Sequence, residues 1–136
     1  SGQKDCAAVK VVLVYICGSL TPRPGKSVCK NVLVAKNAAK YVAGLCEYTG
    51  TGTNARLSKI CWPVCPHANT GYMYGRIPEE VAKLGNDALV KASEVLLVIG
   101  DITDSSGSKE EVRLAKKMSI RVFTGFVGLE KWFRNL

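Results

Sequence analysis

The 136-residue sequence is poor in the features on which several classes of protein depend. Aromatic residues make up 7% of it, and there is a single histidine. No apolar run approaches the ~18 residues needed to span a bilayer, and the N-terminal residues do not form a secretory signal peptide. It also lacks internal repeats, low-complexity tracts and blocks of five basic residues. These absences argue against a membrane-spanning, repetitive or nucleic-acid-binding protein.

What is present is typical of one soluble globular domain. Hydrophobic residues make up 47% and charged residues 22%, and the length suits a single core. We assign residues 1–8 to an N-terminal tail and residues 9–136 to the domain. The net charge of +8 favours an anionic partner.

Six cysteines stand at positions 6, 17, 29, 46, 61 and 65. Cys17 ends a predicted strand and Cys46 a predicted helix, which is typical of small core residues. A disulfide scaffold would be shorter and poorer in regular structure, so we predict a reducing, cytoplasmic location. Cys61, Cys65 and His67 are close in sequence, but there is no second ligand pair. We therefore predict no metal and no cofactor.

The hydrophobic pattern predicts alternating strands and helices. Strands are expected at 9–17, 60–64, 94–100 and 120–124. Pro63 indicates either an edge position or an early end for the second of them. Helices are expected at 31–47 with Asn31 as N-cap, from Pro78 to Ala92, at 108–118 and at 129–134. The expected apolar stripes are Val34, Ala38, Tyr41, Val42 and Leu45 in the first helix, and Val81, Leu84, Ala88 and Ala92 in the second. Residues 49–58, 66–76 and 101–107 are predicted loops.

This alternation predicts an α/β fold. We expect a small doubly wound parallel sheet of four to five strands with helices on both faces, Rossmann-like or flavodoxin-like. Ligands bind such sheets at the carboxyl ends of the strands. Function is therefore expected in the loops after Cys17, Val64 and Gly100.

The loop after Cys17 ends in Gly25-Lys26-Ser27, which resembles a phosphate-binding loop. The Walker A spacing requires a glycine at position 20, where this chain has Leu20. Two prolines, at 22 and 24, also remove backbone N–H donors. We exclude an ATPase loop. Gly18 and Ser19 still allow a ligand to approach closely, and Arg23 or Lys26 can meet an anion; the alternative is a plain surface loop.

The loop after Gly100 leads into a helix whose expected first turn carries Glu111. A carboxylate there would face the ligand crevice, and the positive end of the helix would keep it charged. The alternative is structural, because Ser108-x-x-Glu111 is also the pattern of a capping box.

Four segments, in order, resemble the nucleoside 2-deoxyribosyltransferase family, which includes nucleotide N-glycosidases and uncharacterised phage and bacterial members. They are Val14–Leu20 (VYICGSL), Pro63–His67 (PVCPH), Asn86–Val98 (NDALVKASEVLLV) and Gly107–Ala115 (GSKEEVRLA). Each segment is weakly specific alone; together they span roughly residues 10–124.

The resemblance implies cleavage of the bond between a sugar C1′ and a nucleobase through an oxocarbenium-like transition state. Glu111 would be the nucleophile, Tyr15 would orient it, and Asp87 would hold a sugar hydroxyl. The family has an acid six residues before the nucleophile, where this chain has Ser105. Asp104 or Asp101 would then protonate the leaving base.

The same resemblance implies a substrate site in the three loops. Arg23 and Lys26, with Ser19 and Ser106, would hold a 5′-phosphate. Apart from the resemblance, Trp62, Tyr72 and Tyr74 are expected in or beside the second loop, where they would stack on a base or cover the site, or instead pack in the core or an interface. The expected substrate-binding set is Gly18, Ser19, Arg23, Lys26, His67, Asp101, Ser106, Gly107 and Ser108.

Two functions of different class follow from these observations. The first is an N-glycosidase or base-exchanging transferase acting on a nucleotide or nucleoside. The second is a non-catalytic module that senses or sequesters a nucleotide, which the shifted leaving-group acid favours. Relatives in the family form dimers or tetramers, so we also expect a homo-oligomer, with Phe126, Trp132 and Phe133 at its interface.

Overall fold

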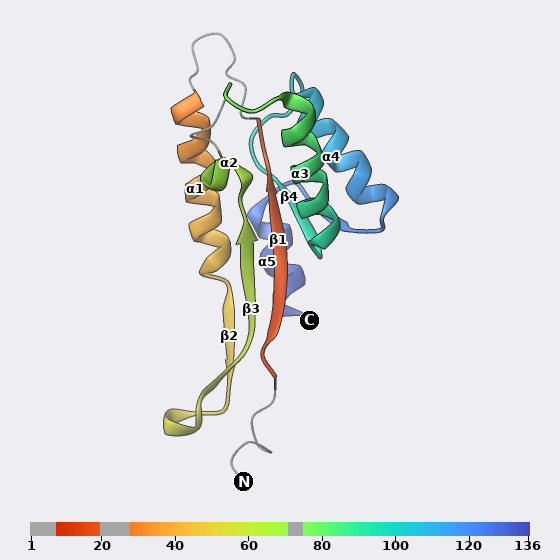
Figure 1. The fold of residues 1–136 in the computed structure, drawn as a ribbon. Helices are drawn as coiled ribbons and strands as arrows, with labels where there is room; N and C mark the ends of the chain where they lie inside the picture. The colour runs from red at the N-terminus through yellow and green to blue at the C-terminus, as the bar shows by residue number, and fades with distance from the viewer. Residues whose placement is uncertain (1–7, 20–27, 71–74) are drawn as a thin grey trace.

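A computed structural model of the chain describes residues 8–19, 28–70 and 75–136 (Figure 1). Within these ranges five strands form one sheet in the order β2-β3-β1-β4-β5. The strands are β1 (Lys10–Cys17), β2 (Cys46–Thr49), β3 (Arg56–Val64), β4 (Val95–Val98) and β5 (Arg121–Phe123). The helices are α1 (Val28–Ala43), α2 (Pro66–Thr70), α3 (Glu79–Ala92), α4 (Ser106–Lys117) and α5 (Phe126–Arg134).

The order in which the chain adds strands to the sheet reverses at the central strand, β1. It pairs in parallel with β3 on one side and with β4 on the other, and β4 pairs in parallel with β5. Tyr15 therefore lies between Val64 of β3 and Leu96 of β4. The predicted doubly wound α/β fold is confirmed. Its topological switch point, where ligands bind in such sheets, lies between the carboxyl ends of β1 and β4.

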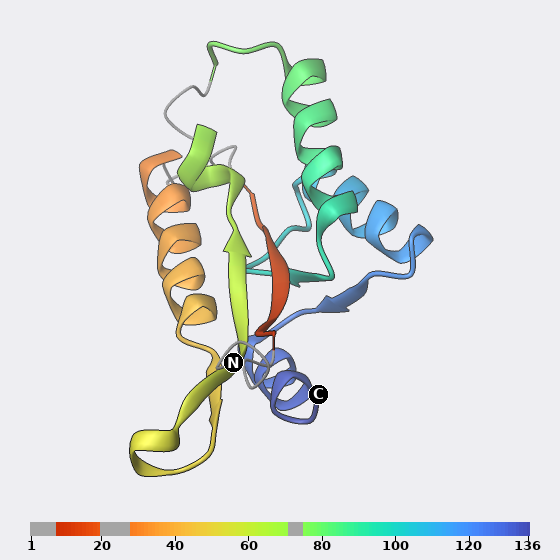
Figure 2. The ribbon, with the colours of Figure 1, turned by 60° about the horizontal axis from the view of Figure 1, so that its bottom comes forward.

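Helices cover both faces of the sheet (Figure 2). On one face α1 and α5 pack on the side chains of Val12, Val14 and Ile16. On the other face α3 and α4 pack on Tyr15 and Cys17. Because alternate residues of a strand point to opposite faces, an apolar run such as 10–17 suits a strand that is buried on both sides. No helix in the part of the chain described here is long and apolar enough to cross a membrane.

One strand was missed by the sequence prediction. β2 occupies residues that were assigned to the end of a helix and to a loop, and it pairs antiparallel with β3. Gly50 and Gly52 have φ values of 82° and 56°, which a glycine adopts without strain, and they turn the chain between the two strands. Cys46 was predicted to end a helix, but it is the first residue of β2. β3 lies inside the sheet, between β2 and β1. However, β2 pairs with β3 only as far as Ile60. Pro63 therefore has a neighbouring strand, β1, on one side only.

A predicted helix start and a predicted loop were also wrong. α1 begins at Val28, so Asn31 lies inside the helix and is not its N-cap. The segment after β3, predicted as loop, contains the short helix α2. Ala38 and Val42 of α1, and Leu45 just beyond its end, are buried as expected, whereas Val34 and Tyr41 are exposed.

The apolar stripe predicted for α3 does not face the core. Val81 and Leu84 are 53% and 71% exposed, and Ala88 and Ala92 are exposed as well. The side of the helix that packs on the sheet is centred instead on Val90, with Leu89 half-buried beside it. Helical periodicity shows that apolar residues share a face, but it does not show which face the sheet covers.

The C-terminal aromatic residues are core residues and not an exposed interface. Phe133 is fully buried, and Phe126 and Trp132 are partly buried against the same core cluster. α5 is anchored by the buried side chain of Lys59, whose Nζ donates to the carbonyl oxygens of Phe133 (2.5 Å) and Leu136 (3.2 Å).

Candidate functional site

Glu111 of α4 reaches across to the end of β1. The hydroxyl of Tyr15 donates a hydrogen bond to its Oε2 atom. The Sγ atom of Cys17 lies 3.6 Å from its Oε1 atom and 3.6 Å from the carbonyl oxygen of Ser108. Tyr15 and Cys17 are two apart in β1, so both point to the face that α4 covers. The carboxylate is thus held at the switch point and is not folded back on the start of its own helix.

The start of α4 differs from the capping box read in the sequence. Ser105 is the N-cap, and its Oγ atom accepts a hydrogen bond from the backbone N–H of Ser108 (3.3 Å). Ser108 is itself buried inside the first turn, and its Oγ atom lies 2.8 Å from that of Ser105. Glu111 consequently lies in the second turn. The capping-box alternative is wrong, and so is the placement of Glu111 in the first turn.

Burial controls the proton equilibria of this cluster. Burial, followed by the charge of Glu111, raises the pKa of the Tyr15 phenol and of the Cys17 thiol far above their ordinary values. Both groups therefore stay protonated at neutral pH and act as donors, not as nucleophiles. Of the three side chains, only the Glu111 carboxylate can attack an electrophilic carbon.

The pKa of Glu111 is raised, mainly because burial disfavours its charged form, and the nearby Asp87 adds to the rise. The hydrogen bonds from Tyr15 and Cys17, and the charge of Lys83, lower it. The sequence-based expectation was that the positive end of the helix would keep Glu111 charged. The structure assigns that role to these side-chain donors, because the dipole effect fades within the first turn.

Asp87 is part of an ion-pair network that sequence reasoning missed. The Nζ atom of Lys83 lies 2.9 Å from Oδ2 of Asp87 and 3.3 Å from Oε2 of Glu110. Lys83 thus connects α3 to α4 beside Glu111. The i,i+4 spacing of Lys83 and Asp87 was a readable signal for this pair, whereas its link to Glu110 depends on the packing of two helices.

The loop between β4 and α4 carries the two candidate proton donors. Oδ1 of Asp101 accepts a hydrogen bond from the backbone N–H of Thr103 (2.8 Å) and another from its hydroxyl. This turn directs Asp101 towards its own loop. Asp104 is exposed near the start of α4, as are Ser106 and Gly107. Of the two serines predicted to bind substrate in this segment, Ser106 is exposed and open to a ligand, whereas Ser108 is buried.

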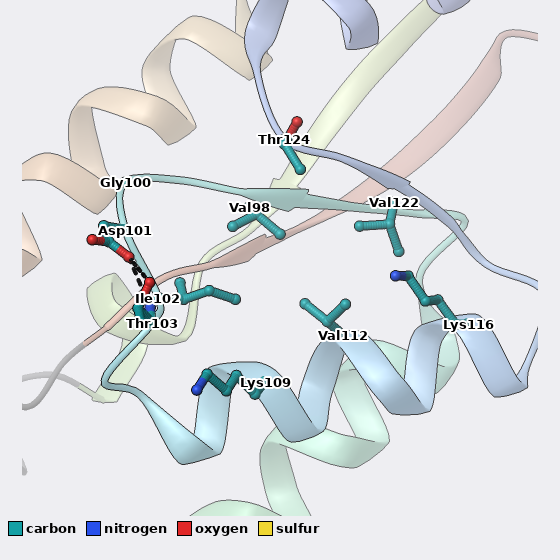
Figure 3. A pocket seen from close by; sticks show the side chains of 10 residues that line it. All are labelled: Val98, Gly100, Asp101, Ile102, Thr103, Lys109, Val112, Lys116, Val122 and Thr124. Atoms are coloured by element: carbon teal, nitrogen blue, oxygen red, sulfur yellow. Dashed lines mark hydrogen bonds between the residues drawn. The ribbon is translucent and has the colours of Figure 1, made fainter.

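A cavity of about 420 Å³ lies beside this loop, between α4 and strands β4 and β5 (Figure 3). Val98, Ile102, Val112 and Val122 form its apolar wall, and the side chains of Asp101, Thr103, Lys109, Lys116 and Thr124 also line it. Of the predicted site residues that the structure describes, only Asp101 contributes. Glu111 does not line this cavity, because it leaves α4 on a different side from Lys109, Val112 and Lys116.

His67 lies at the start of α2, just beyond the end of β3, and is 7% exposed. Burial lowers its pKa, and the nearby backbone of Ser19 and Gly18 partly offsets this. Neither ring nitrogen makes a hydrogen bond within the described ranges. The structure thus brings His67 next to the Gly18–Ser19 turn, as a site built from the loops after β1 and β3 requires.

Gly18 has a packing role that the sequence analysis did not predict. A Cβ atom at this position would lie 2.7 Å from Cγ1 of Ile99. The N–H of Ile99 also donates to the carbonyl of Cys17 at 2.9 Å. The close approach at Gly18 is therefore between the ends of β1 and β4.

The structure does not bring Cys61, Cys65 and His67 together as three ligands of one ion. In the parts of the chain described, no three His, Cys, Asp or Glu side chains are placed to hold an ion. Cys17, Cys46, Cys61 and Cys65 are free thiols, and burial raises the pKa of Cys61 to about 11.

Several predicted site residues cannot be placed. Arg23, Lys26, Tyr72 and Tyr74 lie outside the described residues. Trp62 lies within β3, as predicted, and is 57% exposed there. The described part of the candidate site therefore consists of Tyr15, Cys17 and Glu111 with the Lys83–Asp87 pair, the Gly18–Ser19 turn, His67 and the β4–α4 loop.

Comparison with known proteins adds no relative. No protein-family model matches the chain, and no curated protein or solved structure is significantly similar to it.

Proposed function

We propose that the protein cleaves the N-glycosidic bond of a nucleotide or nucleoside, with Glu111 as the nucleophile. The observation that carries the proposal is the Glu111 carboxylate held by the Tyr15 hydroxyl at the switch point of the sheet. A carboxylate fixed there suits a reaction whose transition state develops positive charge on a sugar carbon. The sequence resemblance to the nucleoside 2-deoxyribosyltransferase family points to the same residue.

In the proposed reaction, an oxygen of Glu111 bonds to C1′ as the bond from C1′ to the base nitrogen breaks. The bonding electrons leave with the base, which takes up a proton. Water, or a second base in a transferase, then attacks C1′ and releases Glu111. Tyr15 keeps the carboxylate oriented, and Cys17 lies against the other oxygen. Both remain protonated throughout, because burial raises the pKa of each far above its ordinary value.

Asp87 and Asp104 are assigned the two remaining roles. Asp87 would accept a hydrogen bond from a sugar hydroxyl while Lys83 fixes its position at 2.9 Å. We assign protonation of the leaving base to Asp104, because Asp101 is directed towards Thr103. The substrate is proposed to be a mononucleotide whose phosphate meets Ser19, Ser106 and the basic residues Arg23 and Lys26.

The test is a panel of nucleosides and mononucleotides incubated with the wild-type protein and with Glu111→Gln. Released base is measured by chromatography. We expect release from at least one substrate and a loss on the order of 10³-fold or more in the variant. Glu130→Gln on α5 is the matched control and should keep full activity. A Glu111→Gln protein as active as the wild type would refute the proposal.

A nucleotide-binding module without catalysis is the second candidate. It is favoured by Ser105, which occupies the position of the family's proton donor and is used here as a helix cap. This function predicts binding by calorimetry with no released base under the same conditions. Retained binding in Glu111→Gln together with inactivity of the wild type would select it over the enzyme.

A further inference from the structure

The cavity between α4 and strands β4 and β5 has no part in the proposed reaction (Figure 3). Lys109, Val112 and Lys116 line it from α4, and their spacing of three and four residues places them on one side of the helix. Glu111 leaves the helix on another side and accepts a hydrogen bond from Tyr15 at the end of β1. The cavity is therefore separate from the Glu111 cluster and requires an explanation of its own.

The inner wall of the cavity is aliphatic. Val98 and Val122 project into it from neighbouring strands, and Ile102 and Val112 face them from the loop and the helix (Figure 3). Val98 is 8% exposed, and the other three side chains are partly buried against the same core cluster. The volume of about 420 Å³ falls in the ~300–1,000 Å³ range of small-molecule pockets. A ligand seated here would bury an aliphatic body against these side chains.

The two ends of the cavity differ in their polar groups. Lys109 and Lys116 are seven residues apart, which separates them by about 10 Å along the helix axis. Lys109 lies at the end that holds Asp101 and Thr103, where the chain leaves β4. Lys116 lies at the other end, and Figure 3 shows its side chain directed back along the helix, with the ammonium group towards Val122. The ammonium group thus lies over the aliphatic wall and away from the carbonyl groups that end α4.

Charge complementarity favours an anionic group at the Lys116 end. Among the described residues that line the cavity, Asp101 is the one acidic residue, and it lies at the opposite end, where it accepts two hydrogen bonds from Thr103. Neither Lys109 nor Lys116 makes an ion pair within the described parts of the chain. The same lining residues include no aromatic ring that could stack on a nucleobase. The cavity therefore suits an acidic group joined to an aliphatic body.

We propose that this cavity binds a small aliphatic carboxylate, with the carboxylate group at Lys116 and the hydrocarbon body against Val98, Val112 and Val122. A carboxylate carries a single charge, which one lysine neutralises. A phosphate is held by several donors, such as arginines or the backbone N–H groups at a helix start, and Lys116 is the one cation among the described residues at its end of the cavity. The inference does not depend on whether Glu111 cleaves a glycosidic bond.

The exposure of Lys116 sets the expected affinity. An ion pair with an exposed lysine strengthens binding by about two- to fivefold, because water screens the charge. Most of the affinity therefore comes from burial of the hydrocarbon body. For a ligand of the size of octanoate we expect a Kd of about 1 mM.

The first experiment is a titration of the isotope-labelled whole chain with octanoate up to about 5 mM, followed through the amide resonances. The amides of Gly100, Val112, Val122 and Thr124 should shift. Octanamide has the same hydrocarbon chain without the charge, so it should shift the same amides with about two- to fivefold weaker affinity. Absence of shifts, shifts confined to other parts of the chain, or equal affinities for the two probes would overturn the proposal.

Lys116→Met tests the charge. Methionine keeps an unbranched apolar stem, so the variant should bind octanamide as the wild type does, while its affinity for octanoate should fall to that for octanamide. Lys117→Met is the matched control, because Lys117 is the next residue of the helix, is exposed and does not line the cavity. It removes the same charge from the chain and should leave octanoate binding unchanged. An equal loss in both variants would refute the role of Lys116.

Val112→Phe tests the position of the hydrocarbon body. The larger side chain would occupy the cavity, so both octanoate and octanamide should bind about tenfold more weakly or worse. Ile102→Phe fills the same space from the loop and replaces Val112→Phe if that variant does not fold. Val127→Phe on α5, where Val127 is 84% exposed, is the control and should bind both probes as the wild type does. Unchanged binding in a folded variant with a filled cavity would show that the ligand site lies elsewhere.

Discussion

Replacing Glu111 with glutamine should make the protein more stable at neutral pH. The folded structure raises the pKa of Glu111, mainly through burial. Folding therefore favours the protonated carboxyl. The stabilisation from that proton is complete below the ordinary pKa of a glutamate and is lost as the pH rises through the raised pKa. Glutamine does not ionise, so the variant escapes this loss.

The magnitude can be bounded from the surroundings of the side chain. Single stabilising substitutions commonly add about 0.5–2 kcal/mol to the free energy of unfolding. Glu111 is half-buried, and Tyr15 can still donate to the glutamine oxygen. We therefore expect a gain in the lower half of that range, about 1 kcal/mol. In a domain of this size it corresponds to a rise of roughly 3–4 °C in Tm.

Thermal unfolding of both proteins from about pH 3.5 to 8 measures this effect, since the range begins below the ordinary glutamate pKa. The two Tm values should converge at the acid end and separate as the pH rises. Glu130→Gln controls for the loss of a carboxylate elsewhere, and its Tm difference from wild type should not follow this course. A Glu111→Gln protein that is less stable at neutral pH, or a difference that does not change with pH, would refute the assignment of a costly buried charge.

Three further substitutions test other contacts. Tyr15→Phe should lower kcat/KM by about 10–100-fold, because a hydrogen bond to a charged group contributes about 1.5–3 kcal/mol; unchanged kinetics would contradict its positioning role. Lys83→Met should shift the acid limb of the pH–rate profile upward, since the lysine lowers the pKa of Glu111, and Lys83→Arg should restore it; coincident profiles for Met and wild type would argue against the network. Lys59→Met should lower the free energy of unfolding in urea by about 1–3 kcal/mol through loss of the carbonyl contacts at the end of α5; equal denaturation midpoints would disprove that anchor.

The sequence by itself determined the class of fold. Short apolar runs rich in β-branched residues, such as 9–17 and 94–100, are typical of strands buried on both faces, and the helical segments between them indicate parallel crossovers. The strand-to-helix order also placed Tyr15 and Glu111 at ends of elements that meet at one edge of the sheet. Their hydrogen bond agrees with the residue pair that the family resemblance indicated.

Only the tertiary structure decided which surfaces face each other. The α3 stripe has clear helical periodicity, yet the sheet covers the opposite side of the helix. Ser105 caps α4 in place of Ser108, so Glu111 lies one turn deeper than its motif indicated and is affected by burial more than by the helix dipole. The Lys83 bridge to Glu110 joins two successive helices that only the packing on the sheet brings side by side. Periodicity records local geometry, whereas burial, proton affinity and ion pairing depend on neighbours that only the packing of the whole chain brings together.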